Sequence, residues 1–133
     1  MILKTTGIDH LNLTVRNLEE SCAFWRNLLG FVSLEEIPEQ NGRIIGNKNA
    51  LLALYEDPNL NIYQKKGFNH LSFHIENFND IEKKCQEMNL NIEYGGVLEW
   101  KKSRSIYFND PNGYEVELSE VWGGGLVDTE QRI

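Results

Sequence analysis

Two segments of the chain alternate apolar and polar residues with the period of two that is typical of a half-buried β-strand. One segment begins at His10 and the other at His70, and both show the same order over nine positions: His, Leu, polar, apolar, polar, apolar, charged, Asn, apolar. The offset between them is 60 residues throughout. The sequence therefore predicts two copies of one structural unit.

A helix is predicted after each of these strands. Asn17 and Asn77 stand where a helix N-cap is expected, and Gly30 stands where the first helix should end. Between these signals apolar residues recur at helical spacing, namely Leu18, Cys22, Trp25 and Leu29 in the first helix and Phe78, Ile81, Cys85 and Met88 in the second. Both cysteines fall within these apolar stripes, so we expect them to be reduced core residues.

After each helix the pattern changes to short strand-like segments separated by turn residues. These segments lie at about 31–38, 42–48 and 50–56 in the first copy and about 91–100, 103–109 and 114–121 in the second. The outline is βαβββ twice, which makes an α+β protein. We expect a single domain made of a first module at about 7–56, a linker at 57–67, a second module at about 68–121 and a mobile tail at 122–133.

All three histidines of the chain, His10, His70 and His74, lie on the polar face of an opening strand. If the two sheets enclose a common hollow, His10 and His70 reach one point. The last strand offers Glu117 as a third ligand from its polar face. Two histidines and one carboxylate with open positions suit non-haem Fe, Mn and related catalytic metals. A hydrogen-bonded structural role for the histidines is the alternative.

Composition narrows the classes of partner. The 133 residues, 41% hydrophobic and 25% charged, are typical of one folded globular domain rather than a disordered chain. With 20 acidic against 13 basic residues the net charge is −7, which disfavours nucleic acid and anionic membranes. No apolar stretch approaches the roughly 20 residues that span a bilayer, and the N-terminus lacks signal-peptide features. We expect a cytoplasmic protein.

Four segments carry a family resemblance: 8–15 (IDHLNLTV), 24–31 (FWRNLLGF), 69–75 (NHLSFHI) and 105–118 (SIYFNDPNGYEVEL). Over about residues 7–121 the chain resembles the vicinal oxygen chelate superfamily. That superfamily holds glyoxalase I, fosfomycin-resistance thiol transferases, extradiol dioxygenases, methylmalonyl-CoA epimerase and bleomycin-resistance proteins. The resemblance implies paired βαβββ modules in a half-open barrel, often completed in a homodimer, around one divalent ion (Fe, Mn, Ni or Zn). It places His10, His70 and Glu117 on the metal-ligand positions.

The resemblance also shows departures. Glyoxalase I has a fourth, carboxylate ligand in the last strand of the first module, where this chain has Ala53, and Glu56 faces the other side of that strand by period-two counting. Fosfomycin transferases use three ligands, but their potassium loop and their basic residues after the last strand have no match here. Extradiol dioxygenases usually have four modules. Glyoxalase I activity and fosfomycin as a substrate are therefore disfavoured.

The leading hypothesis is a metal-dependent enzyme in which oxygens of a small substrate bind the ion, which acts as a Lewis acid. The pocket is expected to include Asn12, Ala53, His74 and Tyr107. Lyase, isomerase, thiol transferase and ring-cleaving dioxygenase reactions all stay open. The rival hypothesis is a metal-free protein of the bleomycin-resistance type that sequesters a small molecule. A regulatory module that uses only the scaffold is a third.

Overall fold

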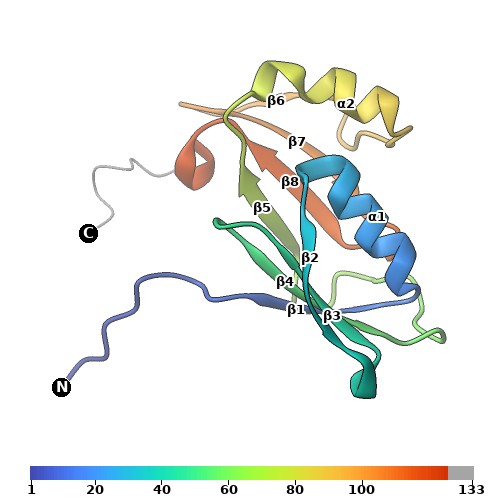
Figure 1. Ribbon diagram of the computed structural model, residues 1–133. Coiled ribbons are helices and arrows are strands. Elements are labelled where there is room, and N and C mark those ends of the chain that lie inside the picture. Colours follow the sequence, from blue (N-terminus) through green and yellow to red (C-terminus); the bar gives the residue numbers. More distant parts are fainter. Residues whose placement is uncertain (126–133) are drawn as a thin grey trace. The chain divides into compact units, whose positions relative to one another are not determined.

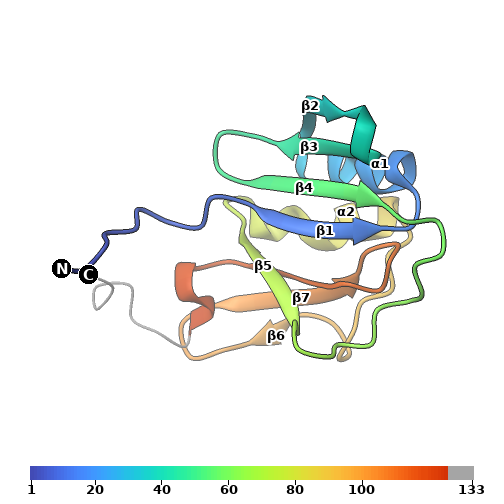
Figure 2. The same cartoon turned by 90° about the horizontal axis from the view of Figure 1, so that it is seen from below.

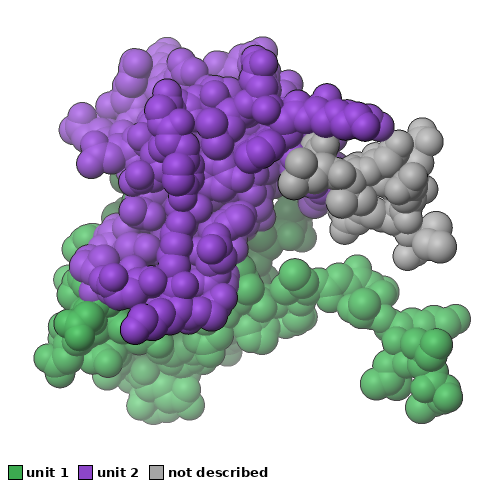
Figure 3. Space-filling model, turned by 180° about the vertical axis from the view of Figure 1, so that it is seen from behind, with its two compact units in different colours: residues 1–61 green, residues 62–133 purple. Residues whose placement is uncertain are grey.

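The computed structural model describes residues 1–125. The described residues form two compact units, 1–61 and 62–125, coloured green and purple in Figure 3. The boundary falls inside the 57–67 segment that was expected to link the modules. Each unit holds one four-stranded sheet and one α-helix in the order βαβββ, which confirms the predicted α+β class and the internal repeat.

Unit 1 follows the repeat closely. Its elements are β1 (Leu11–Val15), α1 (Leu18–Leu29), β2 (Val32–Ile37), the 3-10 turn Pro38–Gln40, β3 (Gly42–Gly46) and β4 (Leu51–Glu56). The strands lie in the order β1-β4-β3-β2, with β1 parallel to β4 and the other pairs antiparallel (Figure 2). Helix α1 packs against β2, β3 and β4 (Figure 1), and Val15, Trp25 and Leu54 are fully buried. Hydrophobic burial on one face of the sheet thus explains the period of two in β1.

The ends of α1 are set by local chemistry. The side chain of Asn17 accepts a hydrogen bond from the Glu20 amide at 2.9 Å, which confirms the predicted N-cap. Gly30 ends the helix in the left-handed conformation, with φ of 71°. The Glu56 carboxylate accepts a hydrogen bond from the Leu18 amide at 2.8 Å, so this side chain lies on the helix side of the sheet, as its position in the alternation predicted.

Replacing Glu56 by Gln is expected to lower the free energy of unfolding by about 1 kcal/mol, because the first turn of α1 loses a charged acceptor at the positive end of the helix dipole. Urea unfolding of the two proteins measures the difference. Glu39→Gln, which removes an exposed carboxylate of unit 1, is the control and should change stability by much less. Equal losses in the two variants would contradict a specific role for Glu56.

Unit 2 repeats the topology. Its elements are β5 (His70–His74), the 3-10 turn Phe78–Asp80, α2 (Ile81–Glu87), β6 (Leu98–Glu99), β7 (Arg104–Asn109), β8 (Glu115–Ser119) and the 3-10 segment Trp122–Gly125. The strand order is β5-β8-β7-β6, with β5 parallel to β8. Ile81 and Cys85 of α2 are buried, as are Phe108 and Val116 of the central strands. Both Cys22 and Cys85 are buried free thiols, as expected.

Two local predictions were wrong. The strand expected at 91–100 is reduced to Leu98–Glu99, because Tyr94, Gly95 and Gly96 adopt positive φ angles of 58°, 83° and 121° and form a turn instead. Asn77 does not cap α2: its amide donates to the Asp80 carboxylate at 3.1 Å, and a 3-10 turn precedes the helix.

The mobile tail predicted at 122–133 lies mostly outside the described residues. Its first part, Trp122–Gly125, is a turn-like segment in which Gly123 and Gly124 adopt positive φ angles of 79° and 66°. In the part of the chain that the structure covers, no helix is long and apolar enough to cross a membrane.

Candidate metal centre

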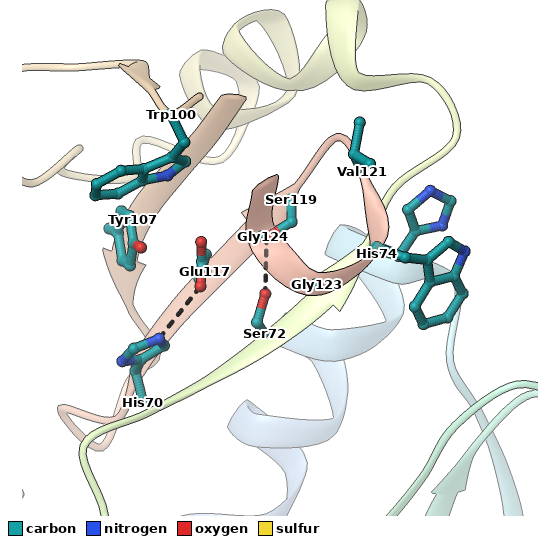
Figure 4. Close-up of a pocket in the computed structure, with 11 residues that line it drawn as sticks. His70, Ser72, His74, Trp100, Tyr107, Glu117, Ser119, Val121, Gly123 and Gly124 are labelled. Atoms are coloured by element: carbon teal, nitrogen blue, oxygen red, sulfur yellow. Dashed lines mark hydrogen bonds and ion pairs between the residues drawn. The ribbon is translucent and has the colours of Figure 1, made fainter. Parts of the chain in front are cut away.

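The parallel pairing of β5 with β8 brings two predicted ligands together. Alternate residues of each strand share a face, so His70 and His74 of β5 lie on the same side as Glu117 of β8. The register pairs Ser72 with Glu117. Nε2 of His70 lies 3.2 Å from Oε1 of Glu117 (Figure 4). These two side chains, 47 residues apart in the sequence, form the centre of the candidate site.

The hydrogen bonds of His70 show which atom faces the carboxylate. Its Nδ1 lies 2.7 Å from the side-chain oxygen of Asn69. When Nδ1 donates to this oxygen, Nε2 of the neutral ring presents a lone pair toward Glu117; in the other tautomer Nε2 itself donates to Glu117. In the first case a metal ion between the lone pair and the carboxylate oxygen makes their approach favourable.

The spacing of the pair fits a metal ion. Ligand bonds of about 2.1 Å place two donor atoms about 3.0 Å apart at a right angle and about 3.4 Å apart at a tetrahedral angle. The observed separation of 3.2 Å between Nε2 of His70 and Oε1 of Glu117 lies between these values. Nitrogen and carboxylate oxygen also form the mixed donor set that Mn, Fe, Ni and Zn accept. The residues present therefore fit a divalent ion.

Glu117 is buried, with 7% of its surface exposed, and is held in one orientation. The Ser105 hydroxyl donates to Oε2 at 2.6 Å, which leaves Oε1 toward His70. Burial alone would raise the pKa of Glu117, but hydrogen bonds from Ser105 and Tyr107 lower the pKa by more. Ser119 and the charge of His70 act in the same direction. The carboxylate is therefore ionised and oriented, as a metal ligand must be.

Tyr107 links this carboxylate to a second acidic group. Burial, and then its hydrogen bond to Glu117, raise the pKa of the Tyr107 phenol, so its hydroxyl remains a donor. Its ring packs edge-on against Tyr94, at 5.3 Å between centroids. The Tyr94 hydroxyl and Nζ of Lys65 both donate to Oε2 of Glu115, at 2.6 and 2.5 Å. Glu115 is thus already paired, although it shares the strand face with Glu117.

A pocket of about 390 Å³ opens beside the pair, within the usual size range of small-molecule sites. Its lining comes entirely from unit 2: His70, Ser72, His74, Trp100, Tyr107, Glu117, Ser119, Val121, Trp122, Gly123 and Gly124. His74 and Tyr107, two of the four pocket residues expected from the sequence, are therefore in the lining. The His74 ring stacks on Trp122, with centroids 4.6 Å apart and planes 14° apart.

Unit 1 contains the other expected site residues. His10 lies immediately before β1 and is half exposed, and its Nδ1 is 2.7 Å from the carboxylate of Asp9. The same arrangement, Nδ1 held by the side-chain oxygen of the preceding residue, occurs at His70. Asn12 is exposed and pairs with buried Ala53, just as Ser72 pairs with Glu117. Ala53 therefore occupies the unit 1 position equivalent to that of Glu117.

The described residues bring together two of the three predicted metal ligands. Within residues 1–125, no three His, Cys, Asp or Glu side chains gather as a metal cluster. His70 and Glu117 make the contact reported above, and His10 belongs to unit 1.

Sequence reasoning did not identify five residues that shape the site: Trp100, Trp122, Ser105, Lys65 and Tyr94. Ser105 could have been identified from the sequence, because it is a polar residue of β7. It lies on the same face of the sheet as Glu117 of the neighbouring strand β8. No sequence pattern indicated a role for Lys65 or Tyr94. They lie in segments without periodicity, and each adopts a positive φ, 57° and 58°.

Comparisons with known proteins show relatives of this chain over most of its length. The model of the Glyoxalase/Bleomycin resistance protein/Dioxygenase superfamily matches residues 7–118. The metallothiol transferase FosB of Staphylococcus haemolyticus is 30% identical over 115 residues, which cover 84% of this chain and 81% of FosB. Glyoxylase I 4 of Arabidopsis thaliana is 25% identical over 128 residues, with 87% and 71% coverage.

Solved structures show the same fold. The fosfomycin resistance protein FosX of Listeria monocytogenes, in complex with Mn(II) and sulfate, superposes with a TM-score of 0.74 at 19% identity. The match covers 92% of this chain and 97% of FosX. From the family match over most of its length, the chain belongs to the Glyoxalase/Bleomycin resistance protein/Dioxygenase superfamily.

Proposed function

We propose that this chain is a metal-dependent enzyme in which His70, Glu117 and His10 hold one divalent ion that binds oxygen atoms of a small substrate. The observation that carries the proposal is the approach of Nε2 of His70 to Oε1 of Glu117 at 3.2 Å, a separation that suits two ligands of one ion. The matched environment of His10, whose Nδ1 is also held by the preceding residue, supports it as the third ligand.

When bound, the ion would supply Lewis-acid stabilisation of negative charge on a substrate oxygen. The residues of the chain have separate tasks. Ser105 and Tyr107 fix the orientation of Glu117 and keep it ionised. Tyr107 also lines the pocket with a protonated hydroxyl, a donor for a substrate oxygen. Lys65 and Tyr94 neutralise Glu115, so that Glu117 is the carboxylate available to a ligand.

The names of the relatives include a glyoxylase and a metallothiol transferase. The pocket of this chain does not favour the substrate of either enzyme. Ala53 stands at the equivalent of Glu117, so the ligand set has one carboxylate. None of the residues that line the pocket in the described part of the chain is Lys or Arg. A strongly anionic substrate such as a phosphonate would therefore lack a partner other than the ion.

Sequestration of a small molecule without metal is the second candidate. The observation in its favour is that residues 1–125 contain no group of three metal-binding side chains. In that case Nε2 of His70 donates a hydrogen bond to Glu117, and the pair has a structural role.

Metal analysis tests the proposal. Wild-type protein purified without chelator is expected to contain about one divalent ion per chain, and His70→Ala and His10→Ala should each bind it at least tenfold more weakly. His74→Ala is the matched control, because His74 lies on the same strand face as His70 and does not contact Glu117 in the structure. Metal content is measured by mass spectrometry and affinity by titration of the metal-free protein. If the wild-type protein binds no ion, the metal-dependent function is wrong and the sequestration hypothesis is favoured.

A further inference from the structure

We propose that the far end of the pocket is a ring-stacking subsite, in which Trp122 and His74 take a flat, uncharged conjugated group of the substrate. The inference rests on the proposed function, because oxygen atoms at the other end of the same molecule would face His70 and Glu117. It adds the class of substrate: an elongated molecule with oxygens at one end and a planar ring system at the other.

The two ends of the pocket are set by β5. His70 begins this strand and His74 ends it, so their backbones are about 13 Å apart at about 3.3 Å per residue. Figure 4 shows His70 and Glu117 at one end of the pocket and His74, on which Trp122 stacks, at the other. Between them lies the Ser72–Ser119 hydrogen bond of 2.9 Å. A ligand that contacts both ends must therefore be elongated.

Trp122 presents an unusual amount of apolar surface. It is 60% exposed, although an indole is among the side chains that gain most from burial. One face of the indole is occupied by the His74 ring, at 4.6 Å between centroids and 14° between planes, so the exposed surface includes the other face. A second flat ligand ring can extend this stack at the offset distances that aromatic groups prefer.

Trp100 lines the same pocket with a second indole. Its Nε1 is buried and has no hydrogen-bond partner among the described residues. The indole adds flat apolar surface to the lining of the pocket.

The charges of the pocket and of the whole chain disfavour a ligand whose ring carries an anionic group. No Lys or Arg lines the pocket within the described residues, and the whole chain carries a net charge of −7. The far end offers indole, imidazole, the Val121 side chain and the backbone of Gly123 and Gly124. A phosphate or carboxylate there would be desolvated without a charged partner, so the group that enters is uncharged.

Two hydroxamic acids with the same oxygen donors and linker test the inference: 4-phenylbutanohydroxamic acid, whose ring is flat, and 4-cyclohexylbutanohydroxamic acid, whose ring is not. Calorimetric titration of the metal-loaded protein is expected to give a dissociation constant about tenfold lower for the phenyl compound. Trp122→Leu, which keeps apolar surface without a flat ring, should remove this preference, and Trp122→Phe should retain most of it. Metal affinity should stay unchanged in both variants.

Leu34→Ala is the matched control, because Leu34 is 53% exposed on β2 of unit 1 and lies outside the pocket lining. It should retain the full preference for the phenyl compound. Equal affinities for the two compounds in wild type would overturn the subsite, as would a preference that survives Trp122→Leu. A Trp122→Leu protein with altered oligomeric state and an intact preference would assign Trp122 to an interface and also overturn the subsite.

The same measurements distinguish a failure of the metal-dependent function from a failure of the stacking subsite. If the protein binds no ion and yet prefers the phenyl compound with the same Trp122 dependence, the stacking subsite is supported and the metal-dependent function is overturned. If it binds the ion and acetohydroxamic acid, which has no ring, but shows no preference between the two ring compounds, the metal function is supported and the subsite is overturned.

Discussion

Replacing Glu117 by Gln is expected to remove the stabilisation of this protein by divalent ions while leaving the metal-free protein at least as stable as wild type. In metal-free wild type, Oε1 of Glu117 faces Nε2 of His70 at 3.2 Å. An amide at position 117 can donate an N–H to the Nε2 lone pair. The other amide atom can still accept from Ser105, whose hydroxyl is 2.6 Å from the carboxylate.

The metal-bound state should respond in the opposite direction. A neutral amide is a much poorer ligand for Mn, Fe, Ni or Zn than a carboxylate, and we expect the metal affinity to fall by about 100-fold or more. An ion present at 100 times its dissociation constant stabilises wild type by about 2.7 kcal/mol. At that concentration the Gln variant should show less than about a quarter of this gain.

Thermal unfolding with added Mn²⁺ and with EDTA measures both effects. Glu115→Gln is the matched control, because Glu115 lies two residues away on the same strand face but is paired with Lys65 and Tyr94. This control should lower stability in both conditions and keep the full response to metal. If Glu117→Gln retains the metal response, Glu117 is not a ligand and its pair with His70 has a structural role.

The parts of the fold that the sequence predicts are those that depend on local rules. The period of two in β1 and β5 and the cap at Asn17 depend on residues within a few positions of each other, and both were recovered. The 60-residue repeat then predicted two equivalent units. His70 was identified from this repeat, and Glu117 was identified from the polar face of the last strand.

The remaining features depend on the tertiary structure. Residues 91–97 are apolar enough for a strand, but the Tyr94 side chain is directed to Glu115, and this contact accompanies a left-handed backbone that no local pattern indicates. Asn77 has the residue type of a cap, but its amide bonds to Asp80 instead. Trp122 follows the last strand among glycines, where neither helical nor strand periodicity applies, so its stack on His74 could not be foreseen.

Replacing Ala53 by Glu is expected to add a second carboxylate ligand and to bind the ion at least tenfold more tightly, with one ion per chain as in wild type. The register gives the reason. Ala53 pairs with Asn12 on β1 and with Ile44 on β3, as Glu117 pairs with Ser72 on β5 and with Tyr107 on β7. The new carboxylate would therefore stand beside the strand that begins just after His10.

The metal-free form of this variant should be less stable than wild type. Ala53 is only 5% exposed, and unit 1 has no counterpart of Ser105 and Tyr107 to donate to the new carboxylate, since the paired residue on β3 is Ile44. An unsatisfied buried polar group is unfavourable by about 1–3 kcal/mol, and more when charged. Ala53→Gln is the control, because it has the same size without the charge: it should be destabilised without the gain in metal affinity. Calorimetric titration with Mn²⁺ gives the affinity and the number of ions. A second ion in the Glu variant would show that the two carboxylates serve separate sites, which contradicts a single centre built from His10, His70 and Glu117.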